Sequence, residues 1–126
     1  STLAAPDRIT DFAVGVDRID LLGAAGQPLP APTAFSRAAT SAAPTLAALV
    51  ADAFQDANGA VAGLQPLAPN AAALVVATTA AIAGPWLVIN DSVAGFQSGS
   101  DLVVSLQGQT GSLPAPGAIP VGAWFG

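Results

Sequence analysis

The stretch from Asp7 to Leu21 reads Asp-Arg-Ile-Thr-Asp-Phe-Ala-Val-Gly-Val-Asp-Arg-Ile-Asp-Leu. It holds four of the eight acidic residues of the chain. Apolar side chains lie between these carboxylates, so the segment can be half buried and half acidic. Gly15 is near the middle, where backbone freedom lets a chain reverse its direction. We therefore predict two short strands, 8–12 and 16–21, joined by a turn.

Composition limits the architecture and the partners. The 126 residues suit one domain, 1–126, with a modest core. Hydrophobic residues make up 52 %, but only seven residues are aromatic, so the core should be packed from small side chains. The net charge of −5 comes with no lysine, which argues against nucleic acid and anionic membranes as partners. An acidic balance carried by aspartate alone fits either hard-cation binding or plain solvation.

Cysteine and methionine are both absent. Without cysteine the chain has no disulfide and no thiolate metal site. Because methionine is missing even at position 1, we expect the chain to be a fragment of a larger protein. No signal-peptide pattern is present in 1–6.

One helix is predicted with an apolar stripe, over 45–57. Its apolar residues recur at helical spacing and should dock on a sheet, whereas Asp52, Gln55 and Asp56 lie on the opposite face. Asn58-Gly59 is expected to end the helix in a left-handed conformation. The stripe consists of Leu46, Leu49, Val50, Ala53, Phe54 and Ala57.

The segment 71–89 carries no charge and is long enough to cross a membrane. Thr78-Thr79 and Gly84-Pro85 interrupt it, and no anchoring residues flank both ends, so strands are the favoured interpretation. We predict a hairpin and strand region over 71–107, with a polar loop that tucks Phe96 inward. Brief edge strands are expected at 34–36 and 121–125. The predicted strands of the region are 73–78, 86–90 and 102–107.

Catalysis is not expected of this chain. It contains no His, Cys, Lys, Glu or Tyr, so the usual general bases and activated nucleophiles are missing. Two aspartates could share a proton, but no Asp-Thr-Gly or Asp-Ser-Gly motif accompanies them. No glycine-rich phosphate loop is present either.

Calcium is the cofactor that the residues allow. It takes six to eight oxygen ligands, many of them from aspartate. In a strand, Asp7 and Asp11 would point to the same side about 13 Å apart, so they cannot form a complete site by themselves. The repeat Gly-Gly-x-Gly-x-Asp, which completes calcium sites in β-rolls, is absent. A shared or peripheral site is therefore predicted.

The spacing of 7–21 resembles the segment that follows the last calcium repeats in RTX-type secreted proteins, including the C-terminal domain of serralysin-type proteases. The stretch Pro85–Val103 is similar to bluetail-like C-terminal domains of bacterial surface proteins. The residues predict a mainly β, sandwich-like fold of short antiparallel strands with one packed amphipathic helix near 45–57. The resemblance implies that this domain caps the end of a parallel β-roll. It also implies a secreted or cell-surface location, with the upstream roll and the type I secretion machinery as partners.

For the site, the resemblance implies that Asp7 closes the last calcium site of the roll. Asp11, Asp17 and Asp20 match the other acids of the motif and are candidate metal ligands. Alternatively, Asp11 and Asp20 bind turn amides, and Asp17 pairs with Arg18 or Arg8. The ending Ala-Trp-Phe-Gly lacks the acidic residue and aliphatic tail of serralysin termini.

Three functions follow as hypotheses. The first is a non-catalytic C-terminal cap of an RTX-like, calcium-dependent extracellular protein, assisting its folding and type I secretion. The second is a self-association or adhesion module of a surface-layer protein, with Trp86, Trp124 and Phe125 on the associating face. The third is the tail of a secreted serralysin-like protease, although the chain itself has no zinc-protease motif.

Overall fold

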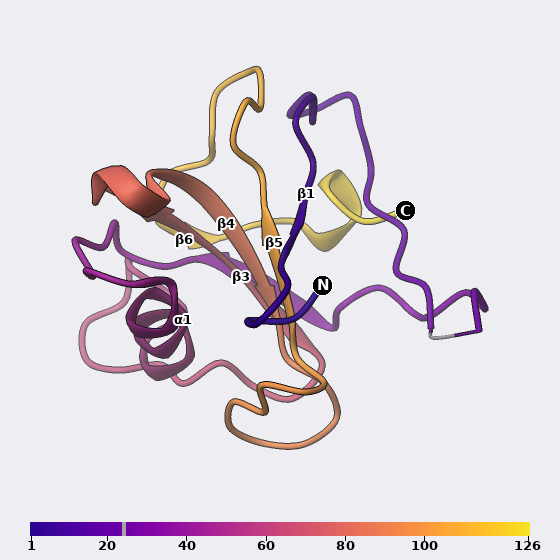
Figure 1. The fold of residues 1–126 in the computed structure, drawn as a ribbon, viewed down its shortest axis with the longest axis horizontal. Helices are drawn as coiled ribbons and strands as arrows, with labels where there is room; N and C mark the ends of the chain where they lie inside the picture. The colour runs from indigo at the N-terminus through magenta and orange to yellow at the C-terminus, as the bar shows by residue number, and fades with distance from the viewer. Residues whose placement is uncertain (24) are drawn as a thin grey trace.

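Six strands form one mixed sheet in the order β1-β5-β4-β3-β2-β6 (Figure 1). The computed structural model describes residues 1–23 and 25–126. A single α-helix in these residues, α1, packs on one face of the sheet. The element bounds are β1 Asp7–Arg8, β2 Ala34–Arg37, α1 Leu46–Gln55, β3 Ala71–Ala77, β4 Gly84–Ile89, β5 Leu102–Ser105 and β6 Gly117–Ala118, with short 3₁₀ helices at Ala80–Ile82 and Val121–Ala123.

The uncharged segment 71–89 forms the centre of the sheet. β3 and β4 pair antiparallel from Ala72↔Ile89 to Ala77↔Gly84, and β5 pairs antiparallel with β4. Both faces of these strands are covered, so nearly every position is buried, which explains the continuous apolar sequence. The predicted hairpin is confirmed. No helix among the described residues is long and apolar enough to cross a membrane.

Two of the pairings between strands are parallel, whereas the predicted fold has short antiparallel strands. β2 pairs parallel with β3, and β1 pairs parallel with β5. The chain from β2 to β3 passes through α1, and a crossover through a helix is the usual way to connect adjacent parallel strands. β2 is therefore flanked by β3 and β6 and is not an edge strand.

Helix α1 lies within the predicted range 45–57. The Thr45 side chain accepts a hydrogen bond from the Ala48 amide (3.2 Å), which caps the first turn. Most of the predicted stripe is buried, including Leu49, Val50 and Phe54. The predicted stop is wrong: the backbone of Asp56 is already extended, with φ −144°, and Gly59 does not adopt a positive φ. The Asp56 carboxylate helps to end the helix by accepting from the amides of Asn58 and Gln65.

Two apolar layers flank the sheet. One lies beneath α1, where the small side chains of β3 let the helix approach closely. The other is covered by the N- and C-terminal segments, where Phe12 and Phe35 pack on Trp124 with ring centroids 5.0 and 5.4 Å apart. Leu102, Val104 and Leu106 all face this second layer, as their alternation predicts.

The aromatic residues predicted to form an associating face are in the core. Trp124 and Phe125 are 3 % and 4 % exposed, and Trp86 is buried beneath the helix side. The predicted edge strand at 121–125 is wrong: Val121–Ala123 is a 3₁₀ helix, and only Phe125 forms a bridge, with Ile19. Because the amphipathic segments at both chain ends are needed to cover the sheet, their aromatic rings are not available to a partner.

The predicted hairpin within 7–21 is also wrong. Only Asp7–Arg8 is a strand, and the chain continues beside the segment after β5, with the Thr110 amide donating to the Phe12 carbonyl (2.9 Å). The turn at Gly15 is confirmed, with φ +83°. The two halves of the segment pair with distant parts of the chain because their apolar side chains bury against the sheet.

Candidate functional site

The acidic segment begins on the edge strand of the sheet. Farther along, its apolar side chains help to cover the second apolar layer. β1 is the edge strand, and its Ile9 neighbour donates its amide to the Ser105 carbonyl (2.8 Å). After the Gly15 turn, the chain runs beside the C-terminus, where the Ile19 amide donates to the Trp124 carbonyl (2.7 Å). The four predicted metal ligands are therefore held on one connected scaffold but not at one point.

Asp7 is exposed on β1. Its carboxylate accepts a hydrogen bond from the Ser1 hydroxyl, and the Ser1 amino group is 3.6 Å away. These two contacts, the hydroxyl first, lower the pKa of Asp7 below its ordinary value. The carboxylate is thus ionised at neutral pH and open to a cation.

Asp11, Asp17 and Asp20 line a shallow hollow of about 410 Å³. Asp17 accepts a hydrogen bond from the Ala13 amide (2.8 Å), so it fixes the Gly15 turn. Arg18, also in the hollow, donates to the carbonyls of Gly122 (2.9 Å) and Asp17 (3.1 Å). Arg18 therefore ties the segment to the C-terminus through carbonyl oxygens. The remaining lining residues are Ile9, Phe12 and Ile19.

The structure thus brings three of the predicted ligands to one hollow and leaves Asp7 outside it. Among residues 1–23 and 25–126, no three acidic, His or Cys side chains converge closely enough to hold a metal ion. A cation at Asp7 needs oxygen ligands from elsewhere, and one in the hollow needs main-chain oxygens or water.

A second acidic cluster, which the sequence analysis missed, lies in the loop between β4 and β5. Asp101 is 0 % exposed; its Oδ1 accepts from the Asp91 amide (2.9 Å) and its Oδ2 from the Gln97 amide (2.6 Å). Burial raises the pKa of Asp101. Asp91 accepts from the Ser100 hydroxyl (2.7 Å) and the Val93 amide (2.9 Å), and these bonds lower its pKa. Two adjacent carboxyl groups therefore have pKa values shifted in opposite directions.

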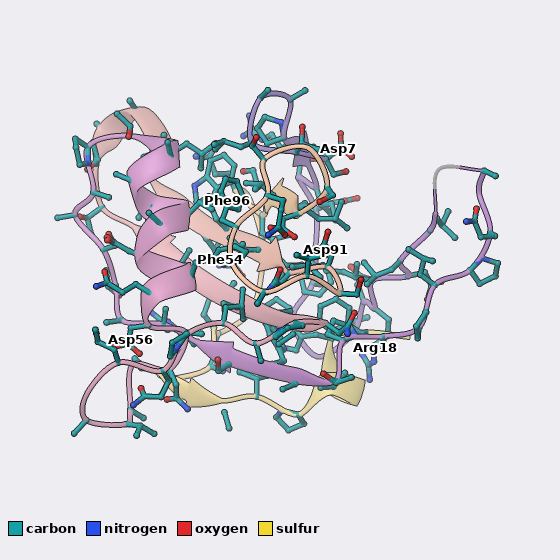
Figure 2. All side chains as sticks on the ribbon, turned by 90° about the horizontal axis from the view of Figure 1, so that it is seen from below. Asp7, Arg18, Phe54, Asp56, Asp91 and Phe96 are labelled. Atoms are coloured by element: carbon teal, nitrogen blue, oxygen red, sulfur yellow. The ribbon has the colours of Figure 1, made fainter. Side chains whose placement is uncertain are left out.

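The loop is anchored to the helix by an aromatic contact. Phe96 lies against Phe54 of α1, with ring centroids 5.2 Å apart in an edge-to-face arrangement, and Figure 2 shows the two rings together beneath the loop that carries Asp91. The predicted inward position of Phe96 is confirmed. The sequence signal that could have located the cluster is the placement of Asn90-Asp91 and Ser100-Asp101 at the two ends of one loop between apolar strands.

A further hollow, of about 330 Å³, lies between α1 and the segment 38–42. There the Ser41 hydroxyl donates to Asp52 (2.6 Å) and accepts from the Ala43 amide (3.1 Å). Ser41 is held by these two bonds, and the sequence contains no histidine or lysine, the side chains that usually activate a serine hydroxyl.

No protein-family model, no curated protein and no solved structure matches the chain.

Proposed function

We propose that the chain is a non-catalytic cap that closes the end of a parallel β-roll in an RTX-like, calcium-dependent extracellular protein. The observation that supports this proposal is the edge strand β1, which is exposed and runs parallel to β5. An edge strand presents unpaired main-chain groups, on which another strand can pair. Because β1 runs parallel to its neighbour β5, a strand of a parallel roll that pairs with β1 in the same direction continues the same arrangement.

Asp7 on this edge would contribute to the last calcium site of the roll. Its carboxylate is exposed and ionised, and the roll would supply the other oxygens from its glycine-rich turns. Asp11, Asp17 and Asp20 lie farther along, around the hollow, where they are peripheral to such a junction. In this proposal calcium binds at the interface of cap and roll, the protein acts outside the cell, and the cap assists folding after type I secretion.

The physical role of such a cap follows from the behaviour of repeat structures. Each repeat contacts only its neighbours, so the terminal repeat needs a cap to cover its open end. The present chain has a core on both faces of its sheet, which gives it a rigid body on which a roll can nucleate. The absence of His, Cys, Lys, Glu and Tyr supports a role without catalysis.

The test joins a β-roll of glycine-rich nonapeptide repeats to the N-terminus of the chain. Circular dichroism then follows roll folding during a calcium titration, with the roll alone for comparison. We expect the cap to lower the calcium midpoint about tenfold, which corresponds to about 1.4 kcal/mol for each calcium ion that binds as the roll folds. Asp7→Asn should remove most of this gain, and Asp52→Asn, on the exposed face of α1, should leave it unchanged.

Equal midpoints with and without the chain would contradict the proposal. An upstream His-Glu-x-x-His motif in the parent protein would instead favour the tail of a serralysin-like protease, in which the same cap follows a catalytic domain.

A further inference from the structure

The loop 90–101 contains more buried oxygen acceptors than nearby donors. Asn90 is 2 % exposed, and its Oδ1 has no hydrogen-bond partner among residues 1–23 and 25–126. The Oε1 atom of Gln97 is also buried and without a partner in these residues. Asp101 adds two fully buried carboxyl oxygens, each of which accepts one main-chain amide. Buried acceptors that lack donors are costly, so such a site favours a proton, a water molecule or a cation.

Asn90 and Asp101 stand opposite each other at the end of the β4–β5 pair. Val88 pairs with Val103 and Ile89 with Leu102, so the next positions along the two strands are 90 and 101. Side chains alternate between faces, which places both residues on the side of Val88 and Val103, beneath α1. The Asn90 amide nitrogen donates to the Leu67 carbonyl (3.2 Å), in the segment that leads into β3. The other end of the same amide, Oδ1, is left without a partner among the described residues, on the face of the sheet that Asp101 shares.

Asp91 follows Asn90 in the chain and lies nearer the surface than Asn90 and Asp101. It is half-buried, and its main-chain amide donates to Oδ1 of Asp101 (2.9 Å), which holds the two residues together at the start and end of the loop. The Ser100 hydroxyl and the Val93 amide hold the Asp91 carboxylate in place. Two aspartates and one unpartnered amide oxygen therefore lie at the base of a twelve-residue loop.

We propose that this loop binds one Ca²⁺ ion through the carboxylates of Asp91 and Asp101 and the side-chain oxygen of Asn90. Two adjacent carboxylates need a positive charge, which a water molecule does not supply. Carbonyl oxygens of the loop and water complete the six to eight ligands that calcium takes. An irregular loop suits calcium better than magnesium, which demands near-octahedral geometry and keeps its water. This site is separate from Asp7 and does not depend on an upstream roll.

The test is calorimetric titration of the whole chain with CaCl₂ after treatment with EDTA, with MgCl₂ for comparison. We expect one calcium per chain, with a Kd of about 10⁻⁴–10⁻³ M, in the range of extracellular modules. Saturating calcium should raise the melting temperature by about 5 °C. Asp91→Asn and Asp101→Asn should each weaken binding at least tenfold, and the matched control Asp52→Asn should bind as the natural chain does.

Absence of calcium binding at millimolar concentration, in a chain that melts cooperatively, would overturn the proposal and assign the surplus acceptors to a proton or water. Calcium binding that persists unchanged in Asp91→Asn would also overturn it. If Asp101→Asn fails to fold, Asp91→Asn decides, because its side chain is nearer the surface. Binding that is lost in Asp7→Asn but kept in Asp91→Asn would refute this site while leaving the cap proposal intact.

Discussion

The two acidic regions of the molecule differ in how deeply their carboxylates are buried and how they are hydrogen-bonded, which the number of aspartates does not indicate. The segment 7–20 has four aspartates, all of them exposed, one on the sheet edge and three around a shallow hollow. The loop 90–101 has only two, but one is fully buried and both are held by main-chain amides. Burial and hydrogen bonding, more than the number of acids, therefore determine which carboxylates the fold depends on.

The largest expected effect in this comparison comes from Asp101→Ala. The change deprives the amides of Asp91 and Gln97 of their acceptor and leaves a small cavity at the end of β5. We expect the free energy of unfolding to fall by about 2–4 kcal/mol. Urea denaturation in EDTA measures the loss. An unchanged midpoint would mean that water replaces the carboxylate fully and that the loop does not depend on Asp101.

A smaller effect concerns pH and the same residue. Because the pKa of Asp101 is raised in the folded state, its proton stabilises the fold below the ordinary value of 3.8, and this contribution is lost as pH rises through the folded pKa. The natural chain should therefore lose stability relative to Asp101→Asn as pH rises from 3 toward 6. Parallel thermal melts of both chains in EDTA measure the difference. A difference in melting temperature between the two chains that stays constant across this pH range would show that Asp101 is not desolvated.

Much of the fold is accessible from the sequence because its signals are local. The apolar stripe from Leu46 to Phe54 has helical spacing, and the uncharged run 71–89 contains an interruption where β3 turns into β4. The parallel pairing of β2 with β3 could not be predicted in the same way. It depends on a crossover through α1, and no local pattern in Ala34–Arg37 specifies a partner.

The candidate sites were less predictable for a related reason. The acids of 7–20 are conspicuous in the sequence. Their placement depends on pairing with residues about a hundred positions away, because β1 pairs with β5 and the rest of the segment forms bridges with the C-terminal segment. Asp101 is a single acid in a polar loop, and nothing in its neighbours signals full burial. Its position becomes clear only when the register of β4 and β5 is known.

Phe96→Ala addresses how the loop is held in place. The ring lies edge-to-face against Phe54, and it is the contact through which the loop packs on α1. We expect a loss of about 1–2 kcal/mol in the free energy of unfolding, from lost apolar burial and the aromatic pair. Hydrogen exchange should show faster opening of the amides of 91–101, while the amides of β3 stay protected. Uniformly faster exchange would indicate that the loop and core open as one unit.

The smallest effect is expected at Asp11→Ala, the counterpart of Asp101→Ala in the other acidic region. Asp11 is exposed and accepts no hydrogen bond from the described residues, so its removal leaves no donor unsatisfied. It also removes one negative charge from a hollow that Asp17 and Asp20 share, in a chain of net charge −5. The melting temperature in EDTA should stay within about 1 °C or rise slightly at low salt, and the rise should vanish at 0.15 M salt as screening weakens the repulsion. A loss comparable to that of Asp101→Ala would contradict the comparison, because an exposed carboxylate would then support the fold as strongly as a buried one.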